Sequence, residues 1–109
     1  MKLPIKRFTV YAILLSPEVL TSKRFRDANP QYLAGRECFY VGMTARSPMD
    51  RFEQHLAGYK SCGYARRFGV ELMPPRFTLI NPRSFEEASA KERRIAARLR
   101  RKGYGVWQN

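Results

Sequence analysis

The sequence contains very little histidine and cysteine. Its 109 residues include one histidine, His55, and two cysteines, Cys38 and Cys62, which lie far apart and form no CxxC pair. A structural zinc site uses about four such ligands, so the sequence offers too few for one. We interpret both cysteines as reduced thiols, with Cys38 buried in a strand.

Long apolar runs are also missing. No stretch approaches the roughly 18 consecutive apolar residues of a membrane-spanning helix, and Met1-Lys2-Leu3-Pro4 does not begin a secretory signal peptide. The sequence has no internal repeats and no low-complexity tracts. These absences predict one small soluble domain in the cytoplasm, and its length is close to the commonest domain size.

Acidic residues are scarce relative to basic ones. Against 21 Lys and Arg there are only 9 Asp and Glu, which gives a net charge of +12, and 15 of the cations are Arg. Such an excess predicts a polyanionic partner, and the planar fork of arginine suits phosphate groups. Nucleic acid is the first interpretation, and an anionic membrane surface or an acidic protein is the second.

The apolar pattern predicts a small α+β domain with a three-stranded antiparallel sheet flanked by helices. The expected strands are 8–15, 37–42 and 75–80. The first expected helix is 48–57, with Ser47 as its cap and Gly58 as its stop. The others are 63–69 and a final helix that begins after the cap Ser84 and ends before Gly103. Residues 16–37 are expected to form a long connection with one helical turn near "SPEVL". The tail 104–109 is expected to pack back on the sheet.

A carboxylate interrupts the apolar side of the final helix. Counting by three and four from Phe85 places Glu92 and Leu99 on that side. A buried carboxylate is costly unless it is paired with a cation or binds a metal. Two interpretations remain open: Glu92 flanks the apolar side and pairs with Arg51 or Lys91, or Glu92 belongs to a functional site.

Four other polar side chains are candidates for chemistry. Arg51 and His55 are four residues apart in the expected helix 48–57, so they share a face. A guanidinium beside an imidazole suits an anionic oxygen, but a solvated helix face would explain the pair equally well. Tyr11 and Tyr40 lie in expected strands, where most tyrosines are core residues. Their phenols would act as bases only beside positive charge or a metal.

Together these residues resemble the GIY-YIG nuclease superfamily. The tripeptides "TVY" (9–11) and "YVG" (40–42) stand at the places of its two signature tripeptides. "YVGMT" is followed by a helix that carries "RFEQH", in which an arginine precedes a histidine by four residues. "ASAKERRIA" supplies the glutamate of a later helix, and Asn109 matches the asparagine near the end of the family's domain. The resemblance covers essentially the whole chain and implies a small antiparallel sheet flanked by helices.

The resemblance implies a role for each matched residue. Glu92 would be the protein ligand of one Mg²⁺ or Mn²⁺ ion. Tyr40 would help to activate the attacking water, and Tyr11 would orient that water and the scissile phosphate. Arg51 would stabilise the charge of the transition state, and His55 would donate a hydrogen bond or shuttle a proton. Seven further residues are expected to contact the substrate: Gly42, Thr44, Lys60, Arg66, Arg67, Arg94 and Asn109.

Three features depart from the family pattern. The first tripeptide lacks its glycine, and residues 16–37 lengthen the connection between the two tyrosine strands. Asn109 is the last residue of the sequence. The longer connection is interpreted as an insertion that reshapes access to the substrate.

The expected function is metal-dependent hydrolysis of phosphodiester bonds in nucleic acid, with DNA as the first candidate substrate and no membrane partner. A non-catalytic nucleic-acid-binding module on the same fold is the alternative. A binder of acidic proteins or anionic membrane surfaces is the third interpretation. DNA affinity that falls steeply with salt would exclude the third interpretation, because phosphate contacts release counterions.

Overall fold

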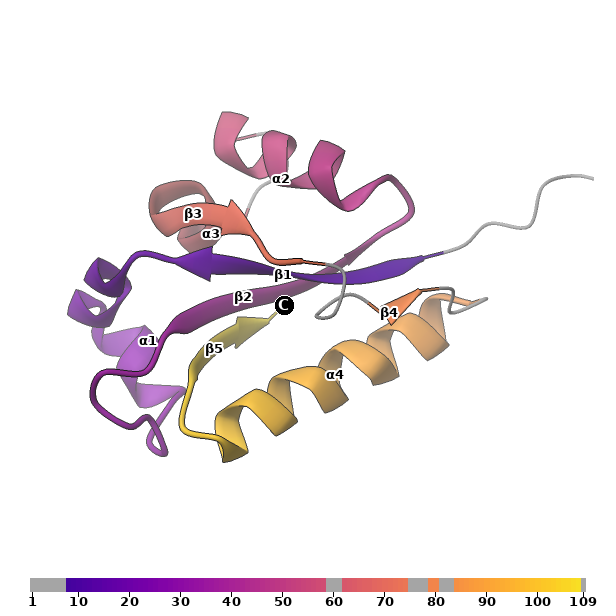
Figure 1. Ribbon diagram of the computed structural model, residues 1–109. Helices are drawn as coiled ribbons and strands as arrows, with labels where there is room; N and C mark the ends of the chain where they lie inside the picture. The colour runs from indigo at the N-terminus through magenta and orange to yellow at the C-terminus, as the bar shows by residue number, and fades with distance from the viewer. Residues whose placement is uncertain (1–7, 59–61, 75–78, 81–83, 109) are drawn as a thin grey trace, which may run out of the picture.

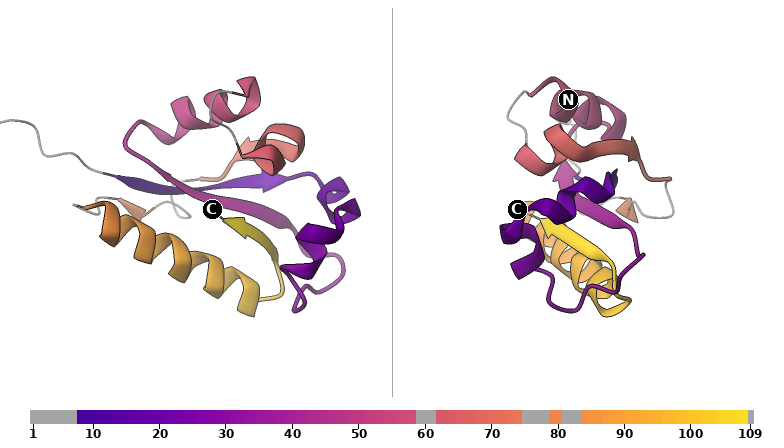
Figure 2. Two further views of the ribbon diagram at one scale, coloured as in Figure 1. Left: turned by 180° about the vertical axis from the view of Figure 1, so that it is seen from behind. Right: turned by 90° about the vertical axis from the view of Figure 1, so that its left-hand side faces the viewer.

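The computed structural model of the protein describes residues 8–58, 62–74, 79–80 and 84–108. The strands are β1 (Thr9–Leu15), β2 (Cys38–Thr44), β3 (Gly69–Leu72), β4 (Leu79–Ile80) and β5 (Gly105–Gln108). The helices are the 3₁₀ helix η1 (Pro17–Thr21), α1 (Lys23–Asp27), α2 (Pro48–Ala57), α3 (Gly63–Phe68) and α4 (Phe85–Arg101). The strands form a middle layer, with α4 on one face and the shorter helices on the other (Figures 1 and 2).

The sheet is mixed. Its strands follow the order β3-β1-β2-β5, and β4 pairs with β1 as well. β1 and β2 are antiparallel from the pair Thr9–Thr44 to the pair Leu15–Cys38, whereas β5 runs parallel to β2. The α+β class is confirmed, but the prediction of three antiparallel strands was wrong in number and in direction. Parallel pairing needs a crossover, and here α4 carries the chain back along the sheet before β5.

The short strands are the elements that the sequence predicted least well. Of the strand expected at 75–80, Leu79–Ile80 forms β4, and 75–78 lies outside the described residues. The expected helix 63–69 is confirmed as α3, although Gly69 already belongs to β3. β3 and β5 have four residues each, which is too short for a clear alternation of apolar and polar residues. The tail packs on the sheet as expected, and it does so as a strand.

The longer helices begin at the predicted caps. Ser47 Oγ accepts a hydrogen bond from the Asp50 amide at 3.1 Å, and Ser84 Oγ accepts one from the Glu87 amide at 3.1 Å. Gly58 ends α2 in the left-handed conformation, with φ of 85°. Helix α2 therefore has its expected bounds.

Among the residues that the structure describes, no helix has both the length and the apolar character needed to cross a membrane.

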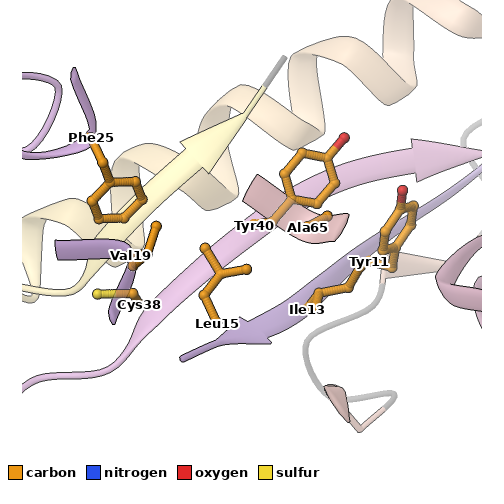
Figure 3. Close-up of a cluster of buried hydrophobic side chains, with 8 residues drawn as sticks. All are labelled: Tyr11, Ile13, Leu15, Val19, Phe25, Cys38, Tyr40 and Ala65. Atoms are coloured by element: carbon orange, nitrogen blue, oxygen red, sulfur yellow. The ribbon is translucent and has the colours of Figure 1, made fainter. Parts of the chain in front are cut away.

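Both faces of the sheet are covered by apolar clusters. Side chains of a strand alternate between the two faces, so Val10 and Ala12 lie in the cluster beneath α4. Tyr11, Ile13 and Leu15 lie in the cluster on the opposite face, which Figure 3 shows. This two-sided burial explains why β1 is apolar along its whole length, as the sequence predicted.

Residues 16–37 are a packed part of the domain. They contain η1, which the sequence predicted, and α1, whose five residues gave no periodic signal. Val19 and Phe25 of this segment are fully buried. The side-chain amide of Asn29 donates to the Val106 carbonyl at 3.0 Å and accepts from the Val106 amide at 2.8 Å. Asn29 therefore stands beside β5 where a neighbouring strand would stand.

Candidate active site

A pocket of about 370 Å³ lies beside the end of β5. β5 pairs with β2 only as far as Gln108 opposite Val41, and α4 begins well beyond the end of β5 (Figure 1). The lining side chains are Tyr11, Tyr40, Met43, Arg51, Phe85, Ser89, Glu92, Arg93 and Gln108. Four of the five residues expected to be catalytic are thus brought together, and they come from four different elements.

Glu92 lies on the buried side of α4. Ala88, Ala96 and Leu99 are buried on the same side, and Glu92 is 6% exposed. Within the described residues Glu92 forms no ion pair, so the closed pairing with Arg51 or Lys91 is not observed. Burial raises the pKa of the Glu92 carboxyl to about 7, an effect that Arg93 opposes. Among the described residues the Glu92 carboxylate therefore has no ion-pair partner, although it borders a pocket.

The two strand tyrosines lie side by side in the cluster opposite α4. Their ring centroids are 6.2 Å apart, and Figure 3 shows both hydroxyls at the same end of the cluster. Burial raises the pKa of Tyr11 to about 12, although the charge of Arg51 lowers it. Burial and the neighbouring phenol of Tyr11 raise the pKa of Tyr40 well above its usual value. At neutral pH both phenols are therefore protonated and can donate hydrogen bonds.

Gly42 makes room for the tyrosine rings. It pairs with Tyr11 across the β1–β2 ladder, and a Cβ atom at this position would lie 2.7 Å from the Tyr11 hydroxyl and 2.8 Å from a ring carbon of Tyr40. Such distances are shorter than van der Waals contact. The glycine of "YVG" is therefore required by the packing of both phenols, and its expected contact with substrate stays a prediction.

Replacing Gly42 with alanine should displace the two tyrosines. We expect the free energy of unfolding to fall by about 1–3 kcal/mol because the strand is overpacked, together with a loss of any activity that depends on the phenols. Urea denaturation measures the first effect. Gly63→Ala is the matched control, because nothing lies within 4 Å of a Cβ atom there, and it should leave the stability unchanged or raise it. Equal effects of the two substitutions would contradict the packing role.

His55 contacts the hydroxyl of Tyr11 through a buried hydrogen bond. It is fully buried, its Nε2 lies 2.8 Å from the Tyr11 hydroxyl oxygen, and its Nδ1 accepts a hydrogen bond from the Cys62 amide at 3.3 Å. Because Nδ1 is an acceptor, the neutral ring carries its proton on Nε2 and donates it to Tyr11. Burial and then the charge of Arg51 lower the pKa of His55 to about 4. His55 thus donates a hydrogen bond to Tyr11, and its expected role in catalysis stays a prediction.

Arg51 supplies positive charge to the pocket. It is half-buried, and its Nη1 donates to Gln54 Oε1 at 3.1 Å. The same guanidinium lowers the pKa of both Tyr11 and His55. Arg51 and His55 thus share a helix face that is turned toward the sheet, which decides against an idle solvated pair.

Most residues expected to contact the substrate lie away from this pocket. Thr44 is buried, and its Oγ1 accepts a hydrogen bond from the Arg46 amide at 3.0 Å. Arg66 and Arg67 are exposed on α3. Arg94 borders a separate hollow of about 130 Å³ together with Lys91, Ile95 and Arg98. Lys60 and Asn109 lie outside the described residues.

Five lining residues were not predicted from the sequence. Phe85 was expected to be buried with Glu92, but it is 58% exposed and packs edge-to-face against Phe8. Phe85, Ser89 and Arg93 repeat every four residues, so helical spacing around Glu92 could have identified them. Met43 and Gln108 gave no such signal, because their positions depend on how β2 and β5 pair.

Comparison with known proteins identifies no relative of this chain. No protein-family model matches the chain, and searches of curated proteins and of solved structures find no match. The functional interpretation therefore depends on the geometry of the pocket and on the resemblance of the sequence motifs.

Proposed function

We propose that this chain is a divalent-metal-dependent endonuclease of the GIY-YIG type, with nucleic acid, and DNA first, as its substrate. The observation that carries the proposal is the shared pocket of Tyr11, Tyr40, Arg51 and Glu92. These residues are separated by up to 81 positions in the sequence, and each has an ordinary structural explanation when taken alone. Their meeting in one pocket supports a common chemical role.

The donor set of the pocket fits a hard divalent cation. Glu92 contributes a carboxylate to the pocket lining. The described residues contain no cluster of three or more His, Cys, Asp and Glu side chains that could hold a metal ion, so a cation here would have few protein ligands. Mg²⁺ and Mn²⁺ accept such a site, because they bind through one or two carboxylates and complete their shell with water and phosphate oxygens. Bound at Glu92, such an ion would supply Lewis acidity at a phosphate oxygen.

The remaining side chains would position and stabilise the phosphate. The Arg51 guanidinium can bind phosphate oxygens and stabilise the charge that develops in the transition state. Tyr11 is held by His55 at 2.8 Å, so its hydroxyl has a fixed direction. Tyr40 is a hydrogen-bond donor at neutral pH. It could take a proton from water only as the phenolate, after its own proton had passed to solvent, and positive charge in the pocket would have to offset its burial for that ionisation.

The carboxylate favours catalysis over simple binding of nucleic acid. Exposed cations such as Arg94 and Arg98 on α4 would attract a phosphate backbone in either case. A buried carboxylate beside the same pocket would repel phosphate unless a cation stood between them. A non-catalytic module would gain nothing from Glu92 in this place.

Cleavage of end-labelled DNA and RNA in Mg²⁺ tests the proposal. Wild type should nick at least one of them, with loss of activity in EDTA and in Glu92→Ala. Without metal, binding of the same oligonucleotides, measured by fluorescence anisotropy, should be at least as tight in the variant as in wild type, because the variant lacks the carboxylate that repels phosphate. Identical background cleavage by both proteins at equal binding would refute the nuclease and favour the binding module. A shallow salt dependence of DNA affinity would point to the third interpretation.

A further inference from the structure

The pocket contains a buried polar atom without a partner. The side-chain carbonyl oxygen of Gln108, Oε1, is buried and accepts no hydrogen bond from any described residue. Buried acceptors are nearly always satisfied, and an unsatisfied one costs about 1–3 kcal/mol. A group that binds in the pocket would remove this cost if it brought a donor or a cation.

Gln108 lies on the face of the sheet that α4 covers, and α4 carries Glu92. Side chains alternate along a strand, and Val106, two residues earlier in β5, packs in the cluster beneath α4. Gln108 therefore faces α4, the helix that carries Glu92, and both side chains line the pocket. The parallel pairing of Gln108 with Val41 fixes the backbone of the glutamine at this place.

The chemistry of Oε1 identifies what it would bind. None of the potential donors that share the pocket hydrogen-bonds to it; these donors are Tyr11, Tyr40, Arg51, Ser89 and Arg93. A neutral carbonyl oxygen is a common ligand of hard divalent cations and supplements a single carboxylate without adding charge. We propose that Gln108 Oε1 is the second protein oxygen of the divalent-cation site at Glu92, an inference that rests on the proposed function.

Titration of the metal-free protein with Mn²⁺, in the absence of nucleic acid, tests this assignment. Free Mn²⁺ is measured by electron paramagnetic resonance for wild type, Gln108→Met and Gln108→Glu. Methionine keeps the length of the side chain but replaces the carbonyl oxygen with a poor ligand for a hard cation. We expect Gln108→Met to weaken Mn²⁺ binding about tenfold, and Gln108→Glu to bind Mn²⁺ more tightly than wild type because it adds a negative charge.

Thermal unfolding without metal separates the ligand role from a structural one. Gln108→Met should unfold at the same temperature as wild type or higher, because it removes an unsatisfied acceptor. A marked fall would mean that the amide supports the fold, and it would overturn the assignment.

Cleavage assays distinguish the remaining outcomes. If wild type cleaves with Mg²⁺ but the Mn²⁺ affinity of Gln108→Met is within twofold of wild type, the assignment fails and the proposed function stands. A rise in KM at unchanged Mn²⁺ affinity would identify Gln108 as a substrate contact and would also overturn the assignment. If wild type neither binds Mn²⁺ nor cleaves, both proposals fail.

Discussion

Glu92→Gln should abolish cleavage and, in the absence of metal, make the protein more stable at pH 8. In the folded protein, burial raises the pKa of Glu92 from 4.5 to about 7. The protonated carboxyl is therefore favoured by folding: its stabilising effect is complete below about pH 4.5 and is lost as the pH rises through 7. At pH 8 the buried carboxylate should cost roughly 3 kcal/mol, which a neutral glutamine avoids.

Urea denaturation in EDTA at pH 5 and pH 8 measures this effect. Wild type should lose stability relative to Glu92→Gln over this range, and the two proteins should differ least at pH 5. Glu53→Gln, on the exposed face of α2, is the control for removing a carboxylate without burial, and its difference from wild type should be small at both pH values. A Glu92→Gln variant that is less stable than wild type at pH 8 would mean that the carboxylate has a stabilising partner in the fold.

Cation binding should reverse the order of the two proteins. Mg²⁺ or Mn²⁺ at Glu92 would compensate the buried charge, so millimolar cation should raise the melting temperature of wild type and leave Glu92→Gln unchanged. Cleavage by the variant should fall by about a thousandfold or more, since metal assistance contributes several kcal/mol to such reactions. Residual cleavage near the wild-type rate would exclude Glu92 as the metal ligand.

Protonation of His55 should offset the stability that acid adds through Glu92. The folded pKa of about 4 lies below the ordinary value of 6.5, so the unfolded chain binds the proton first. The stabilising effect of the neutral imidazole is complete above about pH 6.5 and is lost as the pH falls toward 4. The difference between the folded and unfolded pKa of His55 corresponds to a loss of roughly 3 kcal/mol in the free energy of unfolding once the pH is below both values. Since Glu92 acts in the opposite direction and its pKa shift is of similar size, the two effects should nearly cancel in wild type between about pH 4.5 and 6.5.

Nuclear magnetic resonance can follow this titration directly. His55 is the single histidine of the sequence, so the imidazole signal near 8 ppm belongs to one residue and should titrate with a midpoint near pH 4. Denaturation of His55→Gln provides the thermodynamic control: without the imidazole the effect of Glu92 is unopposed, so the stability of the variant should rise as the pH falls from 6.5 to 4, whereas that of wild type should change little. A midpoint near 6.5 would show that the ring is solvated and does not hold Tyr11 in the way described.

Local signals in the sequence predicted the elements that local chemistry determines. One serine cap and a terminal glycine marked α2, and the start of α4 followed from Ser84. The position of Glu92 among buried alanines followed from helical spacing alone. The resemblance of motifs, rather than spacing, suggested that Tyr11 and Tyr40 would share a site with it.

Features that depend on distant pairing could not be predicted in the same way. The direction of β5 depends on the path of α4 across the sheet. A pattern within a few neighbouring residues carries no information about that path. The place of Gln108 follows from that pairing, so it was missed together with the strand. The number of strands was wrong for a related reason, because β3 has only four residues and pairs with β1 far away in sequence.

The side-chain amide of Asn29 has a consequence for self-association. An unprotected edge strand is a template on which a second molecule can add its own strand. At Val106 both backbone hydrogen-bonding groups of β5 are already used by Asn29, and Arg100 Nη2 also donates to the same carbonyl at 3.0 Å. A dimer or fibril could grow from this edge only after Asn29 had been displaced, so the segment 16–37 protects the sheet from edge-to-edge aggregation at this point.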